Sequence, residues 1–222
     1  MAGSHLLILN SGGLRSLVAT ALTLSQVDRR RVTFLHVVDG RANAPVRLDH
    51  LHRQAEHFQI DRVLEVDMPH LYAHGQGRTA EGGAAGPLVG PQLLLTAMAQ
   101  AHLHHAGRVI WPISCNSEVR AVAQATERMM LCNQLAETEF SPGPCPYVEA
   151  PLLELNDQQV IELGAQMGVP WGLSWSCAGA GESICRTCPA CRRRNTAFTK
   201  AGLADPLESP RRLRIRRPHQ EV

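Results

Sequence analysis

Four cysteines near the end of the chain constrain its fold more than any other feature of the sequence. They lie within fifteen residues in the spacing C-x7-C-x2-C-x2-C, as Cys177, Cys185, Cys188 and Cys191. Four thiolates at such a spacing close a tetrahedral shell around a zinc ion and leave no position for a water molecule. The pattern therefore predicts a structural zinc ion that takes no part in the chemistry, so the functional residues are expected elsewhere.

The length and composition indicate one globular domain with a small extension. A chain of 222 residues with 44% hydrophobic and 19% charged residues buries one sizeable core. The net charge of +2 gives no sign of a nucleic-acid partner. Lys200 is the only lysine, which excludes a Walker A loop because that loop requires a lysine. Contacts to phosphates or carboxylates are then expected from arginines and backbone amides.

Cysteine usage indicates a reducing compartment. The chain has seven cysteines, an odd number, and four of them have the spacing of metal ligands. We interpret the other three, Cys115, Cys132 and Cys145, as buried or incidental thiols. The N-terminus has no basic segment before a long apolar stretch, and no apolar run approaches the ~20 residues of a membrane span. We therefore expect a cytoplasmic protein.

Hydrophobic patterns alternate between strands and helices along the chain. Apolar runs of strand length occupy residues 5–10, 31–38, 63–67, 109–115 and 147–153. Segments with helical periodicity occupy residues 14–22, 46–58, 91–106, 117–137, 156–167 and 192–201. Asn156 and Gln159 are the predicted N-cap and N3 residues of the helix that begins at 156. Strands that alternate with helices form parallel sheets with crossover connections. The sequence thus predicts an α/β fold of Rossmann-like type, with a five-stranded parallel sheet and helices on both faces.

The remaining segments set the expected boundaries. Residues 69–90 are rich in glycine and alanine and form a predicted long loop. We expect a nucleotide-binding α/β domain over residues 1–170, a zinc-binding helical extension over 171–208 and a basic tail over 209–222. The tail holds five arginines. It is either a solvated, disordered end or a contact for an acidic or nucleic-acid partner.

A glycine-containing loop follows the first predicted strand. Its residues are Ser11, Gly12, Gly13, Leu14, Arg15 and Ser16. Backbone amides at the start of a helix bind phosphate without a lysine, and ligands of parallel sheets lie at the carboxyl ends of the strands. The loop is therefore a predicted phosphate site.

Two segments together resemble one known family. The loop is similar to the S-G-G-x-D-S pyrophosphate loop (PP-loop) of ATP pyrophosphatases, and residues 173–202 resemble 7-cyano-7-deazaguanine synthases. The resemblance extends from the loop to Asp205. It implies a fold of the adenine nucleotide alpha hydrolase type, a homodimer and an ATP-dependent C–N ligase of queuosine biosynthesis.

The resemblance also implies a reaction and the residues that serve it. The carboxylate of 7-carboxy-7-deazaguanine would be adenylated, ammonia would displace AMP, and the amide would be activated again and dehydrated to a nitrile. Pyrophosphate would leave through the loop, held by the amides of Gly12 and Gly13 and the hydroxyls of Ser11 and Ser16, with Mg²⁺ to neutralise the phosphates.

Further site residues follow from the same resemblance. Asp39 lies in the turn that would contact the nucleotide. Trp175 is a substrate candidate that either stacks on a purine-like base or packs as a core indole. Arg128 is a second substrate candidate. The catalytic residues stay open, with Ser11, Arg15 and Ser16 as candidates.

The chain departs from the family pattern at three places. Arg15 stands where the family has an aspartate, so a fixed positive charge replaces a carboxylate that would orient magnesium. Residues 89–92 lack the arginine and asparagine of the family's P-G-R-N segment, and residues 126–128 keep only the arginine of Y-P-D-C-R. Adenylation would then need another carboxylate, for which the candidates are Asp39, Glu118 and Glu127.

These departures leave two principal hypotheses. The first is an ATP-dependent adenylating ligase that acts on a deazaguanine carboxylate or a related acid. The second is a non-catalytic or re-purposed relative that binds a nucleotide or deazapurine, or serves as a subunit of a larger assembly. A third, a zinc module that binds nucleic acid, is disfavoured by acidic residues near the cysteines and by the near-absence of lysine.

Overall fold

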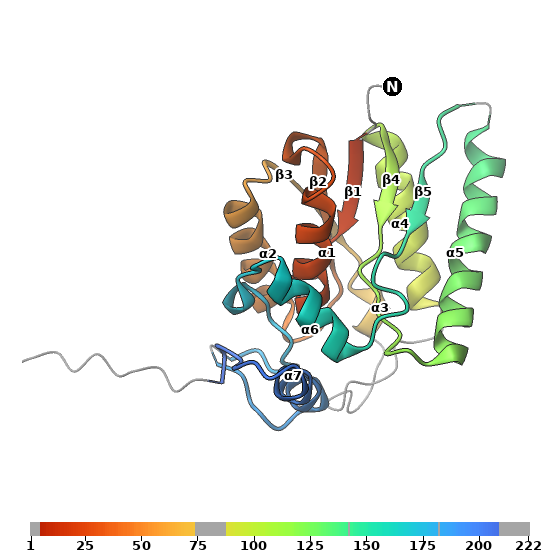
Figure 1. Cartoon of the computed structure of the whole chain (residues 1–222). Helices are drawn as coiled ribbons and strands as arrows, with labels where there is room; N and C mark the ends of the chain where they lie inside the picture. Colours follow the sequence, from red (N-terminus) through yellow and green to blue (C-terminus); the bar gives the residue numbers. More distant parts are fainter. Residues whose placement is uncertain (1–4, 74–87, 142, 182, 209–222) are drawn as a thin grey trace, which may run out of the picture.

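Five parallel strands form one sheet in the order β3-β2-β1-β4-β5 (Figure 1). The computed structural model describes residues 5–73, 88–141, 143–181 and 183–208. Within them the strands are β1 (His5–Leu9), β2 (Val32–Val38), β3 (Arg62–Asp67), β4 (Ala106–Ile110) and β5 (Tyr147–Glu149). The predicted α/β fold class is confirmed. The strand order reverses beside β1, and the loop after such a switch strand is where open α/β sheets bind ligands.

The core lies on both faces of this sheet because neighbouring side chains of a strand point to opposite sides. On one face, Leu6 and Ile8 of β1 pack with α1 (Leu14–Leu24), α2 (Ala44–Phe58) and α6 (Asp157–Gln166). On the other face, Leu7 packs with α4 (Val89–Leu103) and α5 (Val119–Phe140). A central strand buried on both sides explains why its sequence is a continuous apolar run.

Two predicted strands end earlier than expected. The fourth was predicted over residues 109–115, but β4 begins at Ala106 and ends at Ile110, shortly before Pro112, which has no amide for a ladder. The fifth was predicted over 147–153, but β5 ends at Glu149, and residues 151–154 turn from Pro151 onward. Prolines thus end both strands.

The predicted loop over residues 69–90 contains short elements at its two ends. Helix α3 spans His70–Ala73, and α4 begins at Val89 rather than at the predicted residue 91. Pro91 is tolerated there because the first turn of a helix makes no intrahelical bond through its amides. The rest of the predicted loop, residues 74–87, lies outside the described residues, as does the arginine-rich tail beyond residue 208.

The C-terminal part continues from α6 to a last helix. Asn156 and Gln159 form the predicted capping box, with both reciprocal hydrogen bonds at 2.9 Å. After a short 3-10 turn (Trp171–Leu173), α7 (Pro189–Lys200) lies beyond the carboxyl ends of the strands (Figure 1). Phe198 of α7 packs with Ile161 of α6, which attaches the cysteine-containing segment to the sheet domain. The domain boundary at residue 170 remains a prediction.

The remaining short helix is a 3-10 turn over Arg29–Arg31 before β2. Among the described residues, no helix combines the length and the apolar character that a membrane span needs.

Candidate functional site

The loop after β1 makes a turn that only glycine adopts easily. Gly12 has φ +68°, and a Cβ at this position would lie 2.1 Å from the carbonyl oxygen of Arg47 in α2. Its amide donates to the Oδ1 of Asn10 at 2.8 Å, and Asn10 in turn donates to Gln54 at 3.0 Å. Both the positive φ and the close approach of α2 therefore require glycine here.

Internal hydrogen bonds use several groups that we expected to hold phosphate. The amide of Gly12 donates to Asn10, so it is not available to a ligand. The hydroxyls of Ser11 and Ser16 lie 3.1 Å apart, and Ser16 also accepts from the amide of Ser11 at 3.1 Å. No side chain caps α1, so the amides in its first turn stay available to an anion.

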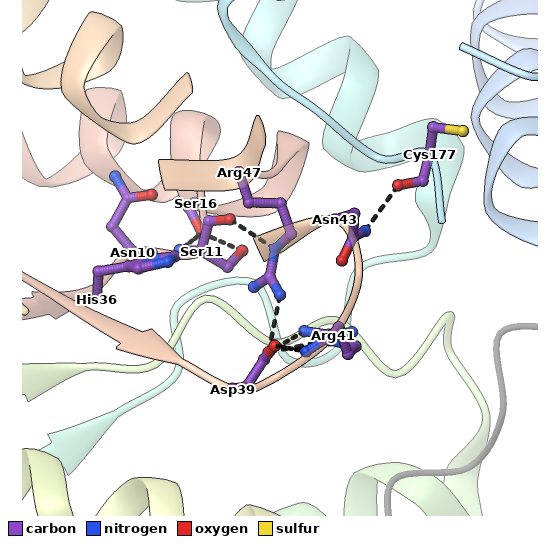
Figure 2. Close-up of polar contacts among 9 residues, drawn as sticks. All are labelled: Asn10, Ser11, Ser16, His36, Asp39, Arg41, Asn43, Arg47 and Cys177. Atoms are coloured by element: carbon purple, nitrogen blue, oxygen red, sulfur yellow. Dashed lines mark hydrogen bonds and ion pairs between the residues drawn. The ribbon is translucent and has the colours of Figure 1, made fainter. Parts of the chain in front are cut away.

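Arg47 connects the loop to the end of β2. Its Nε donates to the carbonyl oxygen of Ser11 at 3.0 Å, and its Nη1 lies 2.8 Å from the Oδ2 of Asp39 (Figure 2). Arg41 also binds Asp39 through its Nε at 2.9 Å. Burial alone raises the pKa of Asp39, but the hydrogen bonds and charges of Arg41 and Arg47 outweigh it and lower the pKa to about 2. Asp39 is thus ionised and held between two guanidinium groups.

The segment before the first cysteine is hydrogen-bonded to the loop. The amide of Trp175 donates to the carbonyl oxygen of Gly12 at 2.9 Å, and the Nδ2 of Asn43 donates to the carbonyl oxygen of Cys177 at 2.8 Å (Figure 2). Arg194 of α7 is buried with Asp205, at 2.6 Å between Nε and Oδ2. These bonds hold the loop and the cysteine segment in one arrangement.

The four cysteines converge as their spacing predicted. The Sγ atoms of Cys177, Cys185, Cys188 and Cys191 all lie within 4.8 Å of one another. Backbone amides point at these sulfurs: Cys188 N donates to Cys185 at 3.3 Å, and Cys191 N donates to Cys188 at 3.4 Å. The amide of Cys188, together with groups of Thr187, lowers the pKa of Cys185 to about 5. Four sulfurs supported by amides fit a thiophilic metal ion such as zinc.

A cavity of about 400 Å³ lies between the loop and the cysteine segment. Its walls include Ser11, Gly13 and Leu14 of the loop, and Ala190 and Ala197 of α7. Its charged lining residues are Arg15, Arg41, Arg47, Arg193, Arg194 and Asp157. Asp39 pairs with Arg41 and Arg47, Asp205 with Arg194, and Asp157 with Arg15 and Arg193. Five guanidinium groups thus face three carboxylates, and the excess of positive charge favours an anion.

Two neutral polar groups in the cavity wall have no hydrogen-bond partner. The Oδ1 of Asn43 and the Nε1 of Trp175 are both buried and unpaired, in side chains that are 7% and 5% exposed. Trp175 packs against Cys177 and Cys191, and its ring centroid lies 5.4 Å from that of His50. Of the two alternatives for Trp175, this burial favours the packed indole. An unpaired donor and an unpaired acceptor beside the cavity fit a polar ligand.

A smaller cavity of about 140 Å³ adjoins the first at the ends of β1 and β2. The two share Ser11, Arg41 and Arg47 in their walls. His36 lines the smaller cavity, and its Nδ1 donates to the carbonyl oxygen of Asn10 at 2.8 Å. Burial lowers the pKa of His36, so its buried Nε2 is an acceptor without a partner.

The structure brings most of the predicted site residues together. The larger cavity is lined by Ser11, Gly13, Leu14, Arg15 and Trp175. The smaller cavity is lined by Ser16 and Asp39, among others. Gly12 lines neither cavity and packs against the backbone of Arg47 in α2. Arg128 is exposed on α5 and is not among the described residues that line either cavity. Of the replacement carboxylates, Asp39 is bound by two arginines, and Glu118 and Glu127 are exposed on α5 or at its start.

Sequence reasoning missed Asp157, which is the carboxylate of the larger cavity. Its Oδ1 accepts from Nη2 of Arg15 at 2.6 Å, and its Oδ2 accepts from Nη2 of Arg193 at 2.9 Å. Burial raises the pKa of Asp157, but the charge of Arg15 and the hydrogen bond of Arg193 outweigh it, so the pKa is lowered. A signal was present, because Asp157 directly follows the recognised helix cap at Asn156.

Comparison with protein families gives a consistent answer. Residues 124–202 match the family described as queuosine biosynthesis protein QueC. A 7-cyano-7-deazaguanine synthase of Nostoc is 48% identical over 81 residues, which cover 36% of this chain and 35% of that protein. Enzymes of that name from Koribacter versatilis and Methanothermobacter thermautotrophicus are 27% and 28% identical, over 91% and 89% of this chain and 92% and 96% of theirs.

The likeness to the QueC family covers residues 124–202, about a third of the chain. The match to the Nostoc enzyme spans about a third of that protein, while the matches at 27% and 28% identity run nearly end to end. The QueC match includes all four cysteines and Asp157, and the loop at Ser11 lies outside it. The C-terminal half thus carries the specific family signal.

Two solved structures share the fold. The U34-tRNA thiolase NcsA of Methanococcus maripaludis, determined with its [4Fe-4S] cluster, has a TM-score of 0.51 at 12% identity and covers 89% of this chain and 64% of its own. An NMN synthetase of Francisella tularensis has a TM-score of 0.50 at 16% identity and covers 91% and 79%. The chain therefore shares the overall α/β fold of these two proteins.

Proposed function

We propose that this chain is a member of the QueC family and an ATP-dependent adenylating ligase that acts on a 7-deazaguanine carboxylate or a related acid. The observation that carries the proposal is the cavity of about 400 Å³ that joins the phosphate loop to the cysteine segment and is lined by five arginines. Excess positive charge beside a free helix N-terminus favours a di- or triphosphate. The proposal that the substrate is a 7-deazaguanine carboxylate rests on the relatives, which are named 7-cyano-7-deazaguanine synthase.

The loop is proposed to hold the phosphates of ATP. Uncapped amides of the first turn of α1, with the guanidinium groups of Arg15 and Arg193, are placed to bind phosphate oxygens. Asp39 orients Arg41 and Arg47 toward both cavities. The smaller cavity at the strand ends is the proposed place of the adenine base.

Trp175 is the proposed contact for the acid substrate. Its unpaired Nε1 donates to a ligand in the larger cavity, and the unpaired Oδ1 of Asn43 accepts from one. Arg128 remains a proposed substrate contact only if the substrate extends toward α5, where Arg128 lies near Gly90.

The proposed reaction consists of two adenylation steps, first of the carboxylate and then of the amide. A carboxylate oxygen attacks the α-phosphorus of ATP, and the bond to the β-phosphate oxygen breaks, which releases pyrophosphate. Ammonia then attacks the acyl carbon, AMP leaves, and a proton is lost. The amide oxygen then attacks the α-phosphorus of a second ATP, which releases a second pyrophosphate. Loss of both N–H protons and departure of AMP, which carries away the former amide oxygen, yield the nitrile. The positive lining of the cavity stabilises the charge that develops on pyrophosphate.

The cysteine cluster is the proposed site of a structural zinc ion. Four sulfurs would complete its coordination, so it would supply stability and no reaction step. Magnesium is a different case, because the carboxylates near the phosphate loop are already bound by arginines. The proposed steps therefore do not depend on it. We further propose a cytoplasmic homodimer that acts in queuosine biosynthesis.

A second candidate is a relative that binds a nucleotide or deazapurine without turnover, alone or as a subunit of a larger assembly. The observation that favours it is the ion pair between Arg15 and Asp157. Arg15 stands at the position where the family has a loop aspartate.

One assay separates the two candidates. Purified protein is incubated with ATP, ammonium and 7-carboxy-7-deazaguanine, with and without magnesium, and AMP, pyrophosphate and nitrile are measured. The ligase predicts two AMP per nitrile. Binding of ATP without any AMP, with an active family enzyme as the positive control, would leave only the second candidate.

A further inference from the structure

Every carboxylate oxygen of Asp157 and Asp39 already accepts a hydrogen bond. Both oxygens of Asp157 accept from guanidinium groups, Oδ1 from Arg15 and Oδ2 from Arg193. In Asp39, Oδ2 accepts from the guanidinium groups of Arg41 and Arg47, and Oδ1 accepts from the backbone amide of Arg41 at 3.3 Å. Mg²⁺ in nucleotide sites is held by one or two carboxylates together with the phosphates. The described residues of the two cavities therefore do not fit a magnesium ion.

Two arginine side chains of the larger cavity, Arg15 and Arg193, supply the positive charge that a metal ion would otherwise provide. Arg15 is the second residue of α1, and its buried Nε has no hydrogen-bond partner among the described residues. Arg15 and Arg193 both pair with Asp157, so that two guanidinium groups share one carboxylate and a net positive charge remains. A guanidinium group binds phosphate oxygens in pairs, which an ammonium group does not.

We infer that this cavity binds the phosphates of its nucleotide as the free anion rather than as the magnesium complex, with Arg15 and Arg193 in the role of the metal. The inference rests on the proposed function, because it takes a nucleotide as the ligand. A magnesium ion bound to ATP removes two negative charges, and these are the charges that the arginines attract. Magnesium therefore competes with the protein for ATP instead of assisting its binding.

The test is calorimetric titration of the full chain with ATP, in EDTA and in excess magnesium, and with inorganic triphosphate as a probe without a base. The inference predicts a dissociation constant for ATP that is about threefold or more lower in EDTA, and binding of triphosphate under the same condition. Each contact from a guanidinium group to phosphate contributes a factor of about ten.

Variants locate the effect. Arg15→Gln and Arg193→Gln are each expected to weaken binding in EDTA about tenfold. Arg120→Gln is the control, because Arg120 is exposed on α5 and is not among the described residues that line these cavities. Arg15→Asp is expected to bind ATP only with magnesium, since it places two carboxylates side by side. Thermal unfolding of each variant establishes that it is folded.

The outcomes separate this inference from the proposed function. Binding of ATP that requires magnesium would overturn the inference and leave the proposed function intact. Binding under neither condition would overturn both. Binding in EDTA that Arg15→Gln and Arg193→Gln leave unchanged would also overturn the inference, because the phosphates would then lie elsewhere.

Discussion

The backbone amide of Trp175 donates a hydrogen bond to the carbonyl oxygen of Gly12, at 2.9 Å. This bond joins the turn at Gly12 to the irregular segment that reaches the first cysteine of the cluster, Cys177, two residues later. The geometry of the loop and the folding of the cluster are therefore expected to depend on each other. Replacement of a cluster cysteine should therefore change the affinity of the proposed phosphate site, although the cysteines are not among the described residues that line the cavity.

Replacement of one cluster thiol tests this dependence. Cys185→Ser is expected to lose the proposed metal ion, to lower the thermal midpoint by about 5 °C or more and to weaken ATP binding, because metal binding would contribute directly to folding. Metal content, thermal unfolding and calorimetry are the measurements. Cys145→Ser is the control, since Cys145 is a free thiol outside the cluster. Metal loss with unchanged ATP affinity would contradict the dependence.

Gly12→Ala tests the turn. The added methyl group would meet the carbonyl of Arg47 at 2.1 Å, and the φ of +68° is strained for alanine. We expect a loss of about 2–4 kcal/mol in the free energy of unfolding, measured in urea. Gly172→Ala is the matched control, because its Cβ would meet nothing within 4 Å and its φ is not positive. Equal effects of the two substitutions would refute the steric argument.

The Asp39 carboxylate predicts an acid-dependent stability. Its folded pKa of about 2 lies below the ordinary value of 3.8, so its contribution is present above about pH 4 and is lost as the pH falls toward 2. The difference corresponds to about 2 kcal/mol at neutral pH. Asp39→Asn is therefore expected to be less stable at pH 7 and to show a flatter dependence of unfolding free energy on pH below 4.

Asp49→Asn serves as the control for this pH profile. Asp49 pairs with Arg53 within α2, and both side chains are more than half exposed, so its contribution is expected to be small. A profile of Asp39→Asn that runs parallel to that of the unmodified chain down to pH 3 would show that the pKa of Asp39 is not lowered.

Trp175→Phe separates packing from recognition. The indole Nε1 has no hydrogen-bond partner among the described residues, so phenylalanine removes a donor while it keeps an aromatic ring in the core. We expect a stability loss below about 1.5 kcal/mol and an affinity for 7-carboxy-7-deazaguanine that is lower by about five- to tenfold. Trp171→Phe, which affects the packing on Phe198 and Gly164, should alter stability alone. Unchanged affinity in Trp175→Phe would remove Trp175 from the site.

Local patterns predicted the parts of the fold that depend on neighbouring residues. The apolar run at β1, the capping box at Asn156 and the cysteine spacing each reflect contacts within a few residues, and each appears as expected. Strand ends were less accurate, because the apolar runs continue past Pro112 and Pro151, near which the paired strands β4 and β5 end.

The site was predicted only in part, because its charges pair over long distances. Arg15 was recognised as a departure from the family, but its partner Asp157 lies 142 positions away. Arg47 binds Asp39 across the start of α2, and the arginines of α7 follow the last cysteine. No local periodicity relates such residues, so their contacts could be identified only from the three-dimensional structure.

The pairing of Arg15 with Asp157 also limits how the sequence can change. An acidic residue at position 15 would face a second acid, and a basic residue at position 157 would face two arginines, so each single exchange of charge passes through a repulsive form. The two positions are expected to vary together among relatives: where position 15 is acidic, position 157 should be neutral or basic. An alignment that shows acids at both would contradict this coupling.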